Sequence, residues 1–292
     1  MLLLLALLFP AVSATSLAVE VIIECNTCVL FAEKCYNVTY LFDIEAPFRN
    51  RVVIHNMGII RASNFLFFSF EPSIEDAEYY KVGFVDLDNP GQVGVIGAGQ
   101  KFNFNFGTFD IDQSNGYVYL GGSDGIYALD TRANKLMHYS SFGDTITNIF
   151  FKNKLYFTRY NDRGIVVKRG DYFKTIFEYI PVKNFVVTKY DFIVFLSKYG
   201  LYVGKADKLQ LVSNNAFYRG ITIDLEDNVY AWWVDGIYKV IIENNIVDSR
   251  VEKVAHLSGI GAMTFDNKNN ILITSDRALY QMTETHYNCT IR

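Results

Sequence analysis

The chain has 292 residues, of which 50% are apolar and 16% aromatic, and only 5 are proline. This composition excludes disorder, collagen and a small disulfide scaffold, and the length allows two ordinary domains or one large barrel, propeller or α/β domain. The 27 Lys and Arg against 31 Asp and Glu give a net charge of −4. Because no window carries a basic run, nucleic acid is not an expected partner.

The first 14 residues have the pattern of a secretory signal. Residues 2–9 form an unbroken apolar run, and Val12 and Ala14 supply the small residues of a signal-peptidase site. No later segment reaches the roughly 18 apolar residues of a membrane span. We therefore expect a signal peptide over residues 1–14 and one secreted, soluble and monomeric domain over residues 15–292, with no membrane partner.

Export places the four cysteines, Cys25, Cys28, Cys35 and Cys289, in an oxidising compartment, which favours disulfide bonds. The spacing of the first two also suits zinc or a redox site, but no second pair and no nearby His completes either chemistry. Four cysteines allow three pairings, and in each of them Cys289 bonds to the N-terminal cluster. We therefore expect a disulfide clasp that ties the two ends of the chain together.

Two N-glycosylation sequons agree with export. They begin at Asn37 and Asn288, each close to a cysteine of the expected clasp. Glycans at these positions would mark one edge of the molecule.

A short motif, Gly followed by two apolar residues, recurs along the chain. It begins at Gly83, Gly125, Gly164, Gly200 and Gly236, and a sixth copy begins with Ala278, at a mean step of 39 residues. An apolar strand is expected before each copy, over residues 65–70, 117–120, 155–158, 192–196, 229–233 and 271–274. A shorter strand and a turn are expected before most of these, over residues 108–111, 146–151, 185–188, 221–225 and 262–265.

Each repeat is therefore expected to contain a strand, a turn, a second strand, a loop, a third strand that begins with the Gly motif, and a more variable fourth strand. Four strands in about 39 residues, repeated six times, predict an all-β chain folded as a six-bladed β-propeller. A β-sandwich would lack this longer period, and helical repeats would show a 3.6-residue pattern that is absent. Residues 36–44 alternate in the manner of a strand and are expected to complete the last blade, which closes the ring.

Signatures of catalysis are missing from the sequence. It has no Gly-x-Ser-x-Gly motif, and the stretch from Gly94 to Gly99 lacks the order of a phosphate loop. The four His are far apart in the chain, although separate blades could still bring them together. The Asp and Asn clusters lack EF-hand spacing and are better explained as turns. We therefore expect no catalytic residue, no metal and no cofactor.

The remaining candidate site is the mouth of the central channel, where the innermost strands of a propeller begin. The residues expected there are amides, aromatic rings and two cations: Arg61, Asn103, Asn105, Phe106, Asn148, Asn184, Tyr218 and Arg219. Such a lining suits a flat, conjugated anion, because rings stack on aromatic faces and Arg pairs with carboxylate or sulfate. The alternative is that these residues only seal the channel. The adjacent Trp232 and Trp233 are expected to pack in the core.

Three segments of the repeat, residues 83–91, 119–127 and 227–230, together with the signal peptide and the size, resemble the ommochrome-binding proteins of lepidopteran haemolymph. This resemblance implies a secreted carrier that binds a phenoxazinone pigment derived from tryptophan and does not turn it over. It supplies no short binding motif, so the channel residues above do not come from it.

Two other functions stay open. The first is a calcium-dependent lactonase similar to the senescence-marker and gluconolactonase propellers, with Asn148 and Asn184 as metal ligands. A lactonase of this kind would also need an acidic ligand at the start of the first inner strand. The sequence has no clear Glu there, which argues against the lactonase. The second is an extracellular propeller that binds proteins, which an apolar top surface would favour.

Overall fold

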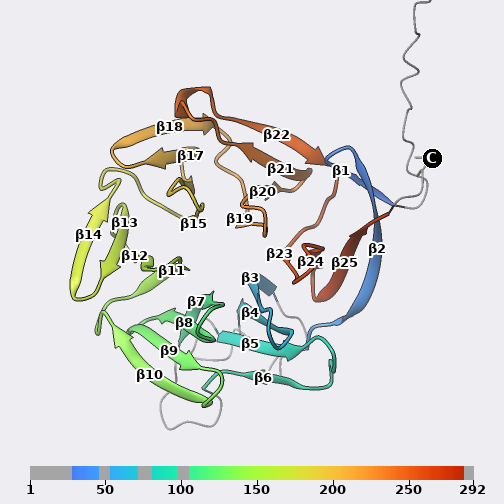
Figure 1. Ribbon diagram of the computed structural model, residues 1–292, viewed down its shortest axis with the longest axis horizontal. Coiled ribbons are helices and arrows are strands. Elements are labelled where there is room, and N and C mark those ends of the chain that lie inside the picture. Colours follow the sequence, from blue (N-terminus) through green and yellow to red (C-terminus); the bar gives the residue numbers. More distant parts are fainter. Residues whose placement is uncertain (1–27, 46–52, 72–80, 98–104, 286–292) are drawn as a thin grey trace, which may run out of the picture.

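Strands make up almost all of the regular structure in the computed structural model, which describes residues 28–45, 53–71, 81–97 and 105–285 (Figure 1). The sheets follow one another around a central axis, as in a β-propeller. The expected signal peptide, Cys25, Cys289, Asn288 and Asn103 lie outside the described residues.

Four of the sheets contain four antiparallel strands each, in which consecutive strands are neighbours. The first sheet contains β3 (Val53–Ile60), β4 (Phe65–Glu71), β5 (Lys81–Asp86) and β6 (Val93–Val95), and the second contains β7 (Phe106–Asp112), β8 (Tyr117–Gly122), β9 (Gly125–Asp130) and β10 (Lys135–Ser140). The third contains β11 (Ile146–Phe151), β12 (Leu155–Arg159), β13 (Ile165–Arg169) and β14 (Tyr172–Ile176), and the fourth contains β15 (Asn184–Val187), β16 (Ile193–Ser197), β17 (Gly200–Lys205) and β18 (Lys208–Ser213). In each sheet the first strand lies nearest the centre of the ring (Figure 1).

The remaining strands form one nine-stranded sheet, here called the shared sheet, in the order β19-β20-β21-β22-β1-β2-β25-β24-β23. Its strands are β19 (Gly220–Ile223), β20 (Val229–Trp233), β21 (Gly236–Ile241), β22 (Arg250–Ala255), β1 (Val29–Phe31), β2 (Lys34–Asp43), β25 (Ala278–Glu284), β24 (Ile271–Ser275) and β23 (Met263–Phe265), and a short 3₁₀ helix (Ile246–Asp248) precedes β22. The last two of the six predicted blades therefore do not form separate sheets. Two four-stranded units are joined because β1 pairs with β22 through Phe31 and Ala255.

The N-terminal segment pairs with the last strand, as residues 36–44 predict. β2 runs antiparallel to β25, from Tyr36 opposite Glu284 to Asp43 opposite Ala278. Backbone hydrogen bonds between the two ends of the described chain therefore complete this part of the ring.

The cysteines near β2 are oxidised. Cys28 and Cys35 are both disulfide-bonded. Because Cys25 and Cys289 lie outside the described residues, the pairing and the clasp between the chain ends stay predictions. Asn37, the first predicted glycosylation site, is exposed on β2.

Backbone geometry explains why the repeated motif begins with glycine. Four of these glycines stand at or just before the start of the third strand with a positive φ: Gly125, Gly164, Gly200 and Gly236. A Cβ atom on Gly200 would lie 2.0 Å from the carbonyl oxygen of Ser213, at the end of the fourth strand. The fourth strand can therefore close over the third only where a side chain is absent. Ala278 stands in the last repeat, where the neighbour is β2 from the other end of the chain.

Three hairpin turns are each held by one carboxylate. Asp224 Oδ1 accepts from the Glu226 and Asn228 backbone N–H groups at 2.9 and 2.7 Å, and its Oδ2 accepts from Asn228 Nδ2 at 2.9 Å. Asp112 and Asp266 hold their turns in the same way. The prediction that these Asp and Asn clusters form turns is confirmed.

Replacing Asp224 with Ala is expected to lower the free energy of unfolding by about 2 to 3 kcal/mol, because the turn donors lose a buried acceptor. Urea unfolding measures the change. The matched control is Asp207→Ala, in the exposed turn between β17 and β18, where a change within about 0.5 kcal/mol is expected. Equal losses in the two variants would contradict the role of the Asp224 carboxylate.

The apolar core lies between neighbouring sheets. Phe67 of β4 and Phe109 of β7 are both buried, and their ring centroids are 6.2 Å apart. All five residues of β16 are buried in the same way between sheets. Among the residues that the structure describes, no helix is long and apolar enough to cross a membrane.

Candidate functional site

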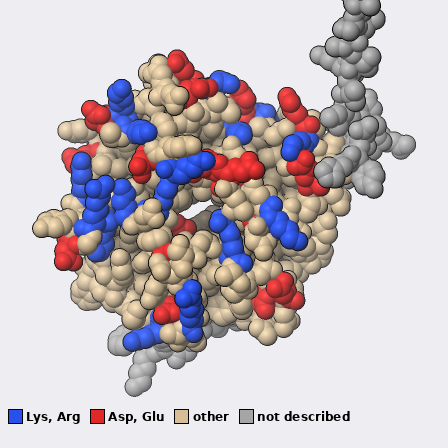
Figure 2. Space-filling view, viewed as in Figure 1, with Lys and Arg blue, Asp and Glu red and all other residues tan. Residues whose placement is uncertain are grey.

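The innermost strands β3, β7, β11, β15, β19 and β23 surround a channel, and Figure 2 shows the ring hollowed at its centre. A cavity of about 690 Å³, here called the mouth cavity, lies where these strands begin. A second one of about 220 Å³, the inner cavity, lies further along the same strands. Asn56, Ile149 and Asn184 line both, so the two cavities adjoin within one channel.

The mouth cavity carries cations, and no carboxylate stands among the described residues that line it. Lys183 and Arg219 lie at its rim, and His55 lines it from the first sheet. Amides and two phenols complete the polar lining: Asn56, Asn105, Asn148, Asn184, Tyr160 and Tyr218. The volume and the charge favour a small organic anion that carries a ring.

Asn148 positions the loop that carries Lys183. Its Nδ2 donates to the Lys183 carbonyl oxygen at 2.6 Å and to Thr158 Oγ1 at 3.2 Å. The Lys183 ammonium lies 3.5 Å from the Ala216 carbonyl oxygen, and its side chain is exposed at the cavity. Because a contact of this length is weak, the ammonium is available to a ligand.

Arg219 and Tyr218 come from the loop before β19. The Arg219 backbone N–H donates to the Trp232 carbonyl oxygen at 2.8 Å, which fixes the backbone, while the exposed side chain lines the cavity. Tyr218 is 8% exposed and packs edge-on against Tyr238. Burial raises the pKa of Tyr218, so its phenol stays protonated at neutral pH and keeps a proton to donate.

The structure brings together five of the residues predicted for the channel mouth: Asn105, Asn148, Asn184, Tyr218 and Arg219. The prediction is wrong for Arg61, which follows the end of β3 and lines the inner cavity instead. It is also wrong for Phe106, which is 2% exposed and packs against Tyr127 in the core. Phe106 is adjacent to Asn105 on the chain, and adjacent strand residues point to opposite faces.

Among the lining residues that were not predicted, His55, Asn56, Tyr160 and Lys183 carry ionisable or amide groups. Lys183 directly precedes the predicted Asn184. A prediction that included the residue before each inner strand would have found Lys183. The prediction for the tryptophans is confirmed. Trp232 is 3% exposed, Trp233 packs against Phe217, and neither lines the two channel cavities.

Asp110 and Arg61 are the charged residues of the inner cavity. Asp110 Oδ2 accepts from the Phe151 N–H at 2.6 Å, which links β7 to β11. Burial raises the pKa of Asp110 to about 7, although this hydrogen bond and the Arg61 guanidinium act in the opposite direction.

The described lining of the mouth cavity does not fit a calcium site. Calcium takes oxygen ligands that usually include carboxylates. The described lining of the mouth cavity contains none. Over the described ranges, no group of three or more His, Cys, Asp or Glu side chains could hold a metal ion.

No family model matches the chain. A curated protein aligns with it over 275 residues at 24% identity, which covers 89% of this chain and 92% of the relative. That relative is the ommochrome-binding protein of Manduca sexta. The resemblance to ommochrome-binding proteins is confirmed.

Solved structures share the fold. The gluconolactonase of Xanthomonas campestris superposes with a TM-score of 0.64 at 9% identity, over 88% of this chain and 95% of the other. Virginiamycin B lyase from Staphylococcus aureus gives 0.55 at 10% identity, over 85% and 99%. At such identities the similarity establishes an all-β propeller fold and no activity.

Proposed function

We propose that this protein is a carrier that binds an acidic, aromatic pigment of the ommochrome class in the mouth cavity without turning it over. The observation that carries the proposal is that Lys183 and Arg219 stand at a cavity whose described lining has no carboxylate. Tyr160 and Tyr218 supply aromatic surface beside them. The relative that binds ommochromes supplies the ligand class.

Binding would need no covalent step by the protein. A planar anion would place its acidic groups against Lys183 and Arg219 through charge-assisted hydrogen bonds. Its ring would lie against the tyrosines, and the Asn184 amide would orient it. Because the cavity is framed by the starts of five inner strands, the site is largely preformed.

The chain would be exported as one monomeric domain over residues 15–292, with the two units of the shared sheet acting as the fifth and sixth blades of a six-bladed ring. Disulfides between the N-terminal cysteines and Cys289 would clasp the ring, and Asn37 would carry a glycan on exposed β2.

A visible-absorbance titration of the purified protein with an ommatin such as xanthommatin tests the function. A saturable shift with one equivalent of pigment is expected, and it is expected to survive EDTA because the described lining of the mouth cavity has no carboxylate to hold calcium. No shift, or one that chelation abolishes, would contradict the carrier. The calcium-dependent lactonase would then be tested by lactone hydrolysis with and without calcium.

A further inference from the structure

Positive charge is concentrated in one part of the ring. Residues 146–213, which contain the third and fourth sheets, carry 12 Lys and Arg against 5 Asp and Glu. The rest of the chain carries 15 against 26. Figure 2 shows Lys and Arg side chains gathered at the left of the ring, where Figure 1 places β13 and β14.

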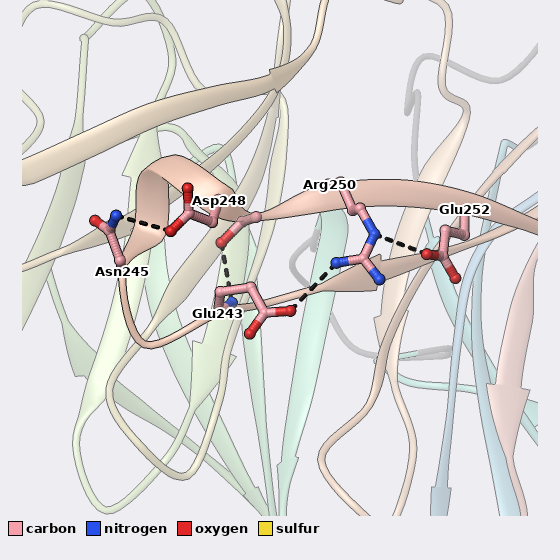
Figure 3. Close-up of polar contacts among 6 residues, drawn as sticks. Glu243, Asn245, Asp248, Arg250 and Glu252 are labelled. Atoms are coloured by element: carbon pink, nitrogen blue, oxygen red, sulfur yellow. Dashed lines mark hydrogen bonds and ion pairs between the residues drawn. The ribbon is translucent and has the colours of Figure 1, made fainter.

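On the shared sheet, carboxylates pair with several of the cations. The Arg250 guanidinium donates to Glu252 at 2.8 Å and to Glu243 at 3.2 Å (Figure 3). Lys154, Lys168 and Arg169 differ, because no carboxylate oxygen of the described residues lies within 4.0 Å of their charged nitrogens. Their charge is therefore available to an external anion.

These cations line two adjoining grooves. A groove of about 400 Å³ between the second and third sheets is lined by Lys154, Lys168 and Arg169 together with Tyr139 of β10. A groove of about 900 Å³ between the third and fourth sheets is lined by Lys154, Arg169, Lys174 and Lys205, and also by Glu178, Asp191 and Asp207. Lys154 and Arg169 line both grooves. Together the grooves form one continuous path, here called the basic track, that crosses three sheets.

Aromatic rings hold the cations of the basic track close to the surface. The Lys168 ammonium lies 5.2 Å from the Tyr139 ring centroid and 5.6 Å from that of Phe173. Tyr172 and Tyr179, which line the larger groove, are 83% and 85% exposed. Exposed phenols offer both a flat apolar face and a hydroxyl, and a sugar ring can use both.

We propose that the basic track binds a sulfated polysaccharide. A small anion would fill one groove, whereas a track that crosses three sheets fits an extended polymer. Sulfate groups form charge-assisted hydrogen bonds with Lys and Arg. An anionic bilayer fits less well, because the cations line two grooves, which a polymer chain can enter and a flat bilayer surface cannot.

Heparin is the probe for this site. The wild-type protein is expected to elute from heparin resin at higher salt than from a sulfopropyl resin, because the polymer occupies the length of the track. The variant Lys154→Glu/Lys168→Glu/Arg169→Glu is expected to lose about tenfold or more in heparin affinity. The matched control, Lys34→Glu/Arg250→Glu/Lys268→Glu, makes the same charge change at exposed positions of the shared sheet and is expected to keep most of the retention.

Thermal unfolding checks that each variant is folded. If the triple Glu variant does not fold, the neutral variant Lys154→Gln/Lys168→Gln/Arg169→Gln decides, and it is expected to elute at lower salt than wild type. Equal losses in the track and control variants, or equal retention of wild type on the two resins, would overturn the proposal. Binding to phosphatidylserine vesicles without retention on heparin would overturn it in favour of a membrane surface.

Discussion

The variant Arg219→Ala is expected to bind an ommatin about tenfold or more weakly than wild type, because it removes a charge-assisted hydrogen bond at the mouth cavity. Arg219 is exposed, and its backbone is fixed by the N–H donated to Trp232, so truncation should leave the fold intact. Absorbance titration at constant ionic strength measures the affinity. Unchanged affinity would remove Arg219 from the site.

A double variant, in which both Lys183 and Arg219 are replaced by Ala, tests whether the two cations bind the pigment independently. If the two cations act on separate acidic groups, the double variant with Lys183→Ala is expected to lose about a hundredfold, because the two effects add. Arg250→Ala is the matched control, since it removes one exposed cation from the shared sheet, away from the channel. An equal effect of Arg250→Ala would point to the overall charge of the protein and not to the cavity.

The variant Asp110→Asn is expected to be more stable than wild type above neutral pH. Burial raises the pKa of the Asp110 carboxyl to about 7 in the folded protein, against an ordinary value of 3.8. Folding therefore favours the protonated form, and the stability that Asp110 contributes in acid is lost as the pH rises through about 7. The Asn side chain keeps an oxygen that can accept from the Phe151 N–H, but it carries no charge.

Urea unfolding at about pH 5 and about pH 8 measures this difference, and the stability gained by the variant is expected to grow by on the order of 2 kcal/mol between them. Asp171→Asn makes the same change at an exposed turn and serves as the control, with no growth expected. Parallel stability curves for Asp110→Asn and wild type would show that the inner cavity does not hold a strained carboxylate.

The fold could be predicted because the repeat follows from backbone geometry. A side chain on Gly200 would meet the Ser213 carbonyl, and a glycine with a positive φ recurs at this place in four of the repeats. The joining of two units through Phe31 and Ala255 could not be predicted, because it rests on one bridge pair between strands more than two hundred residues apart. No local pattern encodes such a pair.

The candidate site could be predicted where the repeat is regular. Asn148, Asn184 and Arg219 each stand at or next to the start of an inner strand that the pattern located. The sequence pattern did not predict the first inner strand, β3, because His55 and Asn56 interrupt its run of apolar residues. As a result Arg61 was placed at the mouth, although it lies beyond the other end of that strand.

The pairing of β2 with β25 also has a consequence for synthesis. Lys34 and Glu284, joined at 2.9 Å, are 250 residues apart. At about 5 to 20 residues per second, a ribosome needs roughly 12 to 50 s between making the two strands. During that time one edge of β2 has no native neighbour, and an unpaired edge is a template for foreign strands. Truncation before β25 is therefore expected to leave β2 with an unpaired edge and to give a product prone to aggregation.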